Sequence, residues 1–360
     1  MDAEVDVAVV GGGVVGCAVA SALARTNRSV LLLEGGPRLG DGVTSRNSGV
    51  IHSGLYYPPQ SLKARACVRG NALLYEWAAA RGVPHARPGK LVIARDAADV
   101  PDLEALEANA RASEAPGVEL VPAAFVRARE PDVPAAAALW CPRTGIVDAV
   151  ELTRSLAADA TEHGALVLTQ ARVRAIARRG PAYELDTARG PVRAERLVNA
   201  AGLHADEVAA LAGVNRYQVH PWRGDYFRFT PSTPYRHLVY PVRRRGAPGL
   251  GVHLTLDLAG RCRLGPDVEH VARKDDYSPR EDKLPAFLAA ARALFGEVRA
   301  DQLAYDGCGI RPKLRAPSDP DEKDFVLSED VPGFVNLVGI ESPGLTAALA
   351  LAERVAALLA

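Results

Sequence analysis

The sequence predicts a two-domain α/β protein in which a Rossmann-like nucleotide-binding domain is interrupted by a domain built on an antiparallel or mixed β-sheet. Three observations predict it. Residues 5–34 have the pattern of a strand, a glycine turn, a helix and a second strand. Strand–glycine–helix steps recur at Ala201-Gly202 and at Gly339, so the first domain is assembled from separated pieces. Between those pieces, residues 218–265 alternate apolar and polar side chains, as strands with one covered face do.

The opening segment has the glycine pattern of a dinucleotide-binding turn. A run of four apolar residues meets three consecutive glycines, and a helix of small residues follows. Gly11 allows the tight turn, Gly13 lets the backbone approach a pyrophosphate, and Gly16 lets the helix pack closely on the strand. The first turn of that helix, with Val14 and Val15, is predicted to present N–H groups to the anion.

A second apolar run, Val30–Leu33, ends at the carboxylate of Glu34, 18 residues after Gly16. An acid near that distance reaches a ribose hydroxyl and disfavours a 2′-phosphate. Residues 7–24 are also apolar enough for a signal peptide or a membrane anchor. Against both alternatives, acidic residues precede the run, glycines fill its centre, and it is short for a membrane span. The pattern therefore favours a dinucleotide-binding unit.

The composition excludes several classes of protein. Of 360 residues, 48% are hydrophobic and 24% charged, which suits a substantial core. The 43 basic and 43 acidic residues balance, so no nucleic-acid partner is indicated. The five cysteines are scattered and form no CxxC motif, so neither a disulfide framework nor a metal site is predicted. We expect a cytoplasmic protein without a transmembrane segment, and peripheral membrane contact stays open.

The remaining elements follow from periodicity and turn residues. Pro131–Pro142 holds three prolines and a run of alanines, so we interpret it as a connection between domains. Helices are predicted at Ser61–Ala80, Asp99–Ser113, Glu151–His163, His204–Ala212, Pro285–Phe295 and Leu345–Leu359. Strands are predicted at Lys90–Ala94, Gly117–Val121, Leu166–Thr169, Val173–Ala177, Tyr183–Thr187, Pro191–Arg193, Leu197–Ala200, Tyr226–Phe229, Leu238–Tyr240, Gly251–Thr255, Arg261–Leu264 and Phe334–Val338.

These elements divide the chain into two discontinuous domains. Residues 1–80, 145–215 and 325–360 are assigned to the nucleotide-binding domain, and residues 81–144 and 216–324 to a substrate-binding domain. A nicotinamide-dependent dehydrogenase more often completes its Rossmann half contiguously. The discontinuous layout favours FAD in a fold of the glutathione-reductase type, with the isoalloxazine at the seam between the domains.

The loop that follows the second strand is a candidate contact for that cofactor. Small residues with free N–H groups and hydroxyls can lie against a pyrophosphate or a flavin edge, and an ordinary polar loop is the alternative. The candidate residues are Thr44, Ser45, Arg46, Asn47, Ser48, Gly49 and Val50.

The segment NSGVIHSGLYYPPQSLKARACVRG, Asn47–Gly70, resembles the FAD-dependent L-2-hydroxyglutarate dehydrogenase/oxidase family, within the D-amino-acid-oxidase and glycerol-3-phosphate-dehydrogenase group. Further matches follow in order, although the C-terminal part resembles the wider group of amine and hydroxy-acid oxidases instead. The matching segments are Gly89–Ala94, Cys141–Asp148, Arg223–Phe227 and Leu250–Asp267, and the C-terminal segments are Tyr305–Leu314 and Gly339–Ala350.

The resemblance implies FAD, a small carboxylate substrate, and oxidation of an α-hydroxy acid, with L-2-hydroxyglutarate to 2-oxoglutarate as the favoured case. It leaves open whether O₂ or a quinone is the electron acceptor. The alternatives are an amine or amino-acid oxidase of the glycine, sarcosine or D-amino-acid type, and an enzyme like glycerol-3-phosphate dehydrogenase. An alternative of another class is a nucleotide-binding protein without turnover.

The resemblance places His52 beside the flavin, where a histidine can accept the hydroxyl proton of an α-hydroxy acid. A neutral histidine that only packs on the ring is the alternative, and His253 is the rival base. Arg311, in a Gly-x-Arg-Pro setting, is the candidate clamp for the substrate carboxylate and also a cofactor contact. Arg223 is the candidate for a second carboxylate. Tyr240 is a candidate wall of the pocket, and packing in the core is the alternative.

Two lysines and the C-terminal turn complete the prediction. A dicarboxylate would need another cation, and Lys63 or Lys313 could also serve. The N-terminus of the last helix is expected at the flavin pyrimidine edge, where it would stabilise an anionic reduced flavin. A simple strand-to-helix turn is the alternative. The remaining predicted cofactor contacts are Val173, Ala201, Gly202, Gly339, Ser342, Pro343, Gly344, Leu345 and Thr346.

Overall fold

The glycine turn joins two parallel strands and a helix. In the computed structural model, which describes residues 3–243 and 251–360, these are β1 (Ala3–Val10), α1 (Val14–Ala24) and β2 (Val30–Leu33). Gly11 has a φ of 111°, a backbone conformation that residues other than glycine rarely adopt. A Cβ atom on Gly16 would lie 1.8 Å from the carbonyl oxygen of Gly11, so the close packing of helix on turn requires glycine there.

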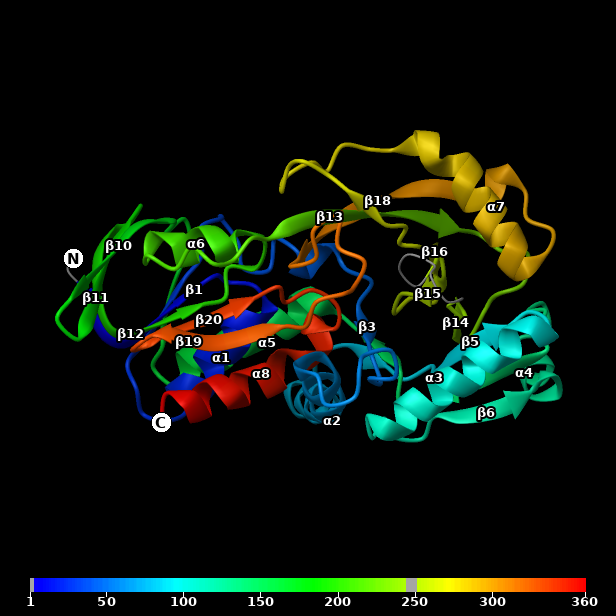
Figure 1. Cartoon of the computed structure of the whole chain (residues 1–360), viewed down its shortest axis with the longest axis horizontal. Coiled ribbons are helices and arrows are strands. Elements are labelled where there is room, and N and C mark those ends of the chain that lie inside the picture. The colour runs from blue at the N-terminus through cyan, green and yellow to red at the C-terminus, as the bar shows by residue number, and fades with distance from the viewer. Residues whose placement is uncertain (1–2, 244–250) are drawn as a thin grey trace.

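The first sheet has eight strands and surrounds β1 (Figure 1). β12 (Gly190–Asn199) pairs in parallel with β1. Along its other edge, β12 pairs first with β11 (Ala182–Thr187), antiparallel, and then with β20 (Phe334–Val338), parallel. The two strands predicted at Pro191–Arg193 and Leu197–Ala200 are therefore one strand. The remaining strands are β9 (Leu166–Leu168), β10 (Val173–Arg179) and β19 (Val326–Val331).

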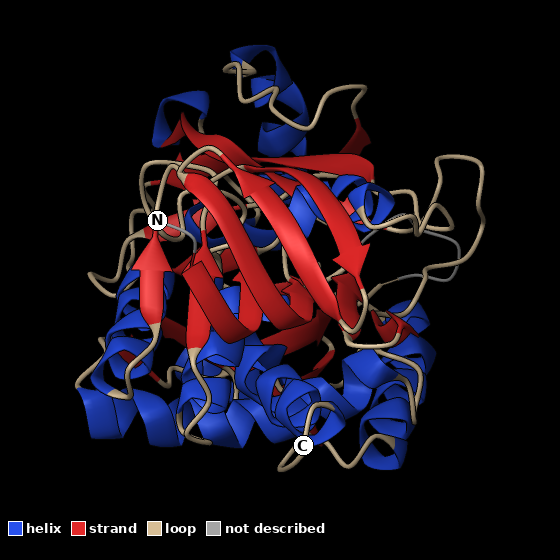
Figure 2. Cartoon of the chain, turned by 90° about the vertical axis from the view of Figure 1, so that its left-hand side faces the viewer, coloured by secondary structure: helices blue, strands red, loops and turns tan. Residues whose placement is uncertain are grey.

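Helices cover both faces of the first sheet. α6 (Ala205–Leu211) lies on one face, and α1, α5 (Ala149–Glu162) and α8 (Gly344–Leu358) lie on the other (Figures 1 and 2). α8 packs against α1 and against α2 (Leu62–Arg81). The start of α8 is thus held by two helices from the N-terminal part of the chain.

The second sheet has nine strands, and its order is β17-β13-β16-β15-β14-β5-β7-β6, with β18 also paired to β13. β13 (His220–Phe229) and β18 (Leu303–Lys313) form a long antiparallel pair that leads from the first sheet into the second lobe (Figure 1). The other strands are β5 (Lys90–Ala94), β6 (Glu119–Pro122), β7 (Ala137–Cys141), β14 (Leu238–Pro241), β15 (Leu254–Leu256), β16 (Cys262–Leu264) and β17 (Glu269–His270).

The interpretation of Pro131–Pro142 as an inter-domain connection is wrong. β7, which lies within this range, pairs with β5 on one side and β6 on the other in the second sheet. Leu139 and Cys141 are fully buried there. The sequence did not predict this strand because alanine has a low β-propensity.

The remaining elements join or cover the two sheets. A small sheet of β3 (Val50–Ile51), β8 (Gly145–Val147) and β4 (His85–Ala86) lies between them. α3 (Val100–Ala112), α4 (Ala123–Arg129) and α7 (Leu284–Phe295) belong to the second lobe (Figure 1). The first sheet draws its strands from residues 3–33, 166–199 and 326–338, and the second from residues 90–141 and 220–313. The domain boundaries given above stay a prediction.

None of the helices in the described part of the chain combines the length and the apolarity needed to cross a bilayer. Residues 1, 2 and 244–250, which include Leu250 of the segment Leu250–Asp267, lie outside the described residues.

Candidate functional site

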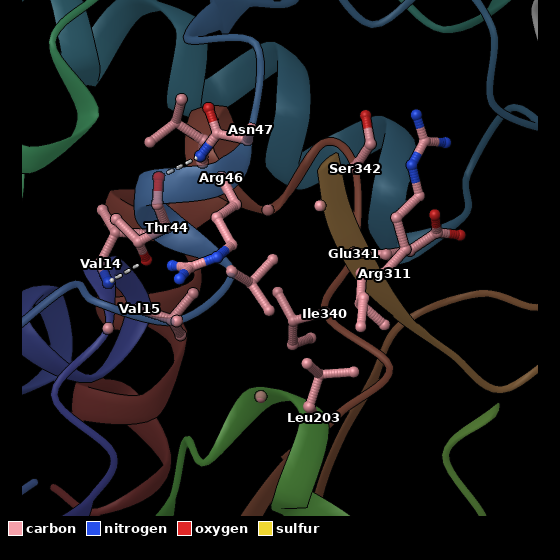
Figure 3. A pocket seen from close by; sticks show the side chains of 18 of the residues that line it. Val14, Val15, Thr44, Arg46, Asn47, Leu203, Arg311, Ile340, Glu341 and Ser342 are labelled. Atoms are coloured by element: carbon pink, nitrogen blue, oxygen red, sulfur yellow. Dashed lines mark hydrogen bonds between the residues drawn. The ribbon is translucent and has the colours of Figure 1, made fainter. Parts of the chain in front are cut away.

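One cavity of about 410 Å³ is lined by both lobes (Figure 3). Gly11 and Gly13 line it at the glycine turn, and Tyr240, His253 and Arg311 line it from the second sheet. We call the part near the turn the phosphate end and the part near His52, Tyr240, His253 and Arg311 the reaction end.

At the phosphate end, the N-terminus of α1 opens toward the cavity. Gly13 is the N-cap of α1 and provides no side-chain cap, so the helix end is left for another acceptor. The N–H of Val14 donates to Thr44 Oγ1 over 3.1 Å. A Cβ on Gly13 would lie 3.3 Å from the same oxygen, which is tight. A pyrophosphate fits this end because backbone donors and the helix dipole are both presented to it.

Glu34 lines the cavity at the predicted place. One carboxylate oxygen accepts from the N–H of Gly12 over 2.7 Å, and the other accepts from the N–H of Gly36 over 2.6 Å. Glu34 therefore also stabilises the turn itself. Each carboxylate oxygen has a further lone pair available for a ribose hydroxyl.

The loop after Gly40 forms one side wall. Arg46 reaches toward the middle of the cavity between Val15 and Ile340 (Figure 3). Its guanidinium lies 4.3 Å from the centroid of Tyr277 and donates to the carbonyl of Asp41 over 2.6 Å. The backbone of this wall is tightly packed, because a Cβ on Gly309 would lie 2.3 Å from the carbonyl oxygen of Arg46.

At the reaction end, His52 follows β3 and is positioned by the start of α8. Its backbone N–H donates to Thr346 Oγ1 over 2.9 Å, and its Nε2 lies 3.4 Å from Ser342 Oγ. Its Nδ1 is buried and has no hydrogen-bond partner among the described residues. Burial, then the positive charge of Lys90, lowers the pKa of His52 well below its ordinary value. His52 is therefore neutral at pH 7 and has a free ring nitrogen.

His253 stacks on Tyr240, with ring centroids 3.8 Å apart and an interplanar angle of 24°. Its Nδ1 lies 2.8 Å from the carbonyl oxygen of Gly251, which requires the Nδ1–H tautomer and leaves Nε2 as an acceptor. Burial lowers the pKa of His253 to about 3, although the bond to Gly251 opposes this shift. His253 is a second neutral imidazole in the wall.

Arg311 lies on β18, opposite Trp222 of β13. It takes part in no ion pair among the described residues. Glu341 lies beside it in the wall (Figure 3). Burial raises the pKa of Glu341, but Lys63, Lys313 and Arg311 together outweigh burial and lower it overall. Arg311 is thus a cation at the reaction end that is free to bind an anionic ligand.

The structure contradicts the assignment of Arg223 to a second carboxylate. Side chains alternate along β13, so Gly224 and Tyr226 line the cavity whereas Arg223 and Asp225 face away from it. Arg223 is fully buried and donates to Asp225 Oδ2 from Nε over 3.0 Å and to Oδ1 from Nη2 over 2.7 Å. Nη1 donates to the carbonyl of Asp276 over 2.8 Å. Nη2 also donates to the carbonyl of Ser278, so the guanidinium is bound by groups outside the cavity, which Arg223 does not line.

Lys63 and Lys313 are also occupied. Lys63 Nζ lies 2.8 Å from Glu341 Oε1, and Lys313 Nζ lies 2.7 Å from Glu322 Oε2 and 3.7 Å from Glu341 Oε1. Neither lysine lines the cavity. These lysines hold Glu341 instead of a ligand.

Most predicted contacts line the cavity, but six do not. Gly16 packs on the turn, and Thr346 accepts a hydrogen bond from the backbone N–H of His52. Ser45, which is exposed, and Gly49 line a neighbouring cavity. Val173, in β10, and Gly339 are also absent from the lining. The contacts that do line it are Gly11, Gly13, Val14, Val15, Glu34, Thr44, Arg46, Asn47, Ser48, Val50, His52, Ala201, Gly202, Tyr240, His253, Arg311, Ser342, Pro343, Gly344 and Leu345.

Sequence reasoning missed part of the lining. Leu203, Tyr226, Tyr277 and Glu341 line the cavity and were not among the candidates. Tyr226 lies on the same β13 face as Gly224, so strand alternation was a signal that could have identified it. Tyr277 lies outside the regular elements, where no periodicity could identify it.

The lining of the cavity fits FAD: it includes the backbone donors of the glycine turn, the carboxylate of Glu34 for a ribose, and the start of α8. Comparison with known families agrees. The model of the family described as "FAD dependent oxidoreductase" (DAO) matches residues 6–358.

Two curated relatives are named L-2-hydroxyglutarate dehydrogenase, mitochondrial. The Arabidopsis thaliana protein is 34% identical over 98% of this chain and 83% of its own length. The Homo sapiens protein is 36% identical over 76% of this chain, and the match spans 63% of that protein's length. Among solved structures, L-alpha-glycerophosphate oxidase from Mycoplasma pneumoniae, reduced by dithionite and with FAD bound, has a TM-score of 0.89, 26% sequence identity, and coverage of 99% of this chain and 94% of that chain.

Proposed function

The chain belongs to the DAO family of FAD-dependent oxidoreductases, and from this premise we propose that it oxidises a small α-hydroxy acid, L-2-hydroxyglutarate to 2-oxoglutarate in the favoured case. One observation carries the proposal: the neutral His52 and the unpaired Arg311 line the same end of one cavity. A base and a carboxylate clamp are the two groups that oxidation of an α-hydroxy acid requires from the protein.

FAD is the cofactor, and the cavity residues have distinct tasks in holding it. The α1 N-terminus would bind the pyrophosphate, and Glu34 would bind the ribose. Gly344 and Leu345, in the first turn of α8, line the reaction end and would place a helix N-terminus beside the flavin ring. When bound, FAD supplies the acceptor, at its N5 atom, for the hydride leaving the substrate Cα.

The protein groups bind the acid and receive its proton. Arg311 would hold the substrate carboxylate through two parallel N–H···O bonds. His52 would take the hydroxyl proton on its free ring nitrogen. In the ligand-free protein the charges of Lys90 and Arg311 lower the proton affinity of this imidazole. An anionic substrate offsets those charges, so substrate binding raises the basicity of His52 when a base is needed.

Two relatives more than 30% identical to this chain carry the name L-2-hydroxyglutarate dehydrogenase, and this supports the choice of substrate. The Mycoplasma structure favours a second candidate, oxidation of glycerol 3-phosphate, because Arg311 could equally bind a phosphate. The two candidates differ in the anion that the reaction end recognises.

The test is anaerobic reduction of the flavin, which is measured as the loss of its yellow absorbance. The panel contains L- and D-2-hydroxyglutarate, L-lactate, glycerol 3-phosphate, glycine, sarcosine and D-alanine. We expect rapid bleaching by L-2-hydroxyglutarate and little by its D-enantiomer. Bleaching by glycerol 3-phosphate alone would replace the proposed substrate, and bleaching by the amino acids alone would make the protein an amine oxidase.

The electron acceptor and the compartment go with this proposal. Mixing the reduced enzyme with O₂ or with a soluble quinone, and timing the return of the flavin absorbance, separates an oxidase from a dehydrogenase. The relatives are named as mitochondrial, so the cytoplasmic location stays a prediction.

A further inference from the structure

Four buried polar atoms without hydrogen-bond partners belong to residues at or next to the reaction end. Among the described residues, His52 Nδ1, Tyr56 Oη, Lys90 Nζ and Tyr240 Oη are all in this condition. Lys90 Nζ lies 4.6 Å from the ring centroid of Tyr56 and 4.7 Å from that of Tyr240. Tyr240 and His52 line the cavity, so the cluster borders the space where a substrate would lie.

Lys90 is the charged member of this cluster. It is the first residue of β5 and is fully buried, with 0% of its surface exposed. Its ammonium has no hydrogen-bond or ion-pair partner in the described part of the chain, only the faces of two tyrosine rings. Cation–π contacts offset only a fraction of the cost of removing an ammonium from water. Burial lowers the pKa of Lys90, and an incoming anion would compensate the charge of its ammonium.

Apart from Arg46, whose guanidinium donates to the carbonyl of Asp41, the other cations near the cavity have acidic partners. Lys63 and Lys313 are paired with Glu341 and Glu322, and Arg223 is paired with Asp225. Lys274, which lines the cavity, lies 2.8 Å from both Asp206 Oδ1 and Glu207 Oε1. At the reaction end, Lys90 and Arg311 are therefore the cations without a carboxylate partner among the described residues. Two such charges match a substrate with two carboxylates.

We propose that Lys90 determines specificity by selecting an α-hydroxy acid that carries a second carboxylate. Arg311 holds the carboxylate next to the reacting carbon, and the second, distal carboxylate lies against Tyr240. The unpartnered Tyr240 hydroxyl, at the edge of the ring, donates to the distal carboxylate, and the Lys90 ammonium over the ring attracts that carboxylate electrostatically. Lys90 acts without touching the substrate, so it is a positioning residue. The inference rests on the proposed function, because it takes the reaction end as the site of a hydroxy acid.

The test compares two ligands of equal chain length that the enzyme does not oxidise, glutarate and pentanoate. Each is titrated into the FAD-loaded protein, and the change in the flavin absorbance spectrum gives a dissociation constant. We expect the wild-type protein to prefer glutarate. Lys90→Met keeps the length of the side chain and removes its charge, so the dissociation constant of glutarate should rise about tenfold or more, while that of pentanoate changes less than about twofold.

Two further variants separate charge from structure. Lys90→Arg retains the charge and should keep a preference for glutarate. Lys313→Met removes a buried lysine that is already paired, so it should leave the ratio of the two dissociation constants within about twofold. Thermal unfolding of the ligand-free protein is the second measurement, and Lys90→Met should raise Tm because it removes an uncompensated buried charge.

Three results would overturn the inference: no preference for glutarate in the wild-type protein, equal losses of both ligands in Lys90→Met, or a lower Tm with loss of FAD in that variant. Failure of the proposed function looks different. If L-2-hydroxyglutarate does not bleach the flavin but glutarate still binds in a Lys90-dependent way, the inference stands and the substrate is another dicarboxylate.

Discussion

At the scale of single residues, the proposed mechanism gives proton transfer and anion binding to different side chains of the reaction end. His52 is neutral and has an unpartnered ring nitrogen, whereas Arg311 is charged and unpaired among the described residues. Their separation into two groups allows substitutions to distinguish loss of chemistry from loss of binding.

Replacement of His52 by alanine should slow the chemistry. We expect the rate of anaerobic flavin reduction by L-2-hydroxyglutarate to fall by about 10²–10⁴-fold, because no base then receives the hydroxyl proton. The measurement is stopped-flow absorbance at saturating substrate, with FAD content as the control for folding. A variant that reduces its flavin at the wild-type rate would contradict the role of His52 and direct attention to His253.

Replacement of Arg311 by methionine should weaken binding. Loss of two charge-assisted hydrogen bonds should cost about 3 kcal/mol or more, which raises the dissociation constant of glutarate about 100-fold or more. Spectral titration of the FAD-loaded variant measures it, and Arg311→Lys should recover part of the affinity through charge alone. Unchanged affinity in Arg311→Met would show that the carboxylate binds elsewhere.

Arg223→Met should affect stability rather than substrate binding. The substitution leaves Asp225 buried with fewer partners, and breaking such a pair costs about 3–5 kcal/mol of unfolding free energy. Urea unfolding measures the loss, and spectral titration of the folded variant should give an unchanged dissociation constant for glutarate. A selective loss of glutarate affinity without destabilisation would return Arg223 to the list of ligand-binding residues.

At the scale of elements, the crossing of α2 and α8 links the fold to the site. A Cβ on Gly70 of α2 would lie 2.1 Å from the carbonyl oxygen of Thr346 in the first turn of α8. Thr346 Oγ1 in turn accepts from the backbone N–H of His52. A change at Gly70, remote from the cavity, is therefore transmitted to both the start of α8 and the position of His52.

We expect Gly70→Ala to displace the start of α8. Overpacking of this kind costs about 1–3 kcal/mol, so thermal unfolding should occur at lower temperature and FAD should be lost more readily during gel filtration. Glu76→Ala, at an exposed position of the same helix, is the matched control and should change neither property. If Gly70→Ala retains FAD and wild-type stability, the two helices are not rigidly coupled.

The elements that the sequence predicted well are those whose signals are local. The β1-turn-α1-β2 unit was predicted correctly because Gly11 and Gly16 are needed by contacts within the unit itself. β18 was missed because two glycines and a proline lie within it, and its pairing with β13 is long-range. Lys90 was missed at the site because a lysine in a strand usually indicates a side chain exposed to solvent. Only the structure shows that two tyrosine rings cover its ammonium. Arg223 was misassigned although its partner is two residues away, on the same face of the strand.

At the scale of the whole molecule, the buried histidines make stability depend on pH. His52 and His253 are neutral in the folded protein because their pKa values are lowered, whereas in the unfolded chain they protonate near the ordinary value of 6.5. Below pH 6.5 the unfolded chain binds more protons than the folded one, so stability falls as pH falls. The lowered pKa of Glu341 acts in the same direction at lower pH, because its stabilisation is lost as pH falls through that pKa.

Each histidine should contribute a slope of up to about 1.4 kcal/mol per pH unit below pH 6.5. Urea unfolding of the protein between pH 4.5 and about 7.5 measures the slope. His253→Gln removes one titrating ring, so its stability should depend less steeply on pH over the same range. An unchanged slope in that variant would mean that His253 does not remain neutral when the protein is folded.

The pairing of β12 with β20 has a consequence for biosynthesis. β20 and α8 are synthesised long after β1 and α1, yet β20 pairs with β12, and α8 packs on α1. A nascent polypeptide therefore cannot close its nucleotide-binding sheet until residues 334–358 have left the ribosome, and contacts of such long sequence separation form slowly. Capture of the flavin should consequently follow the synthesis of β20 and α8, and a ribosome-stalled chain that lacks both elements should emerge colourless.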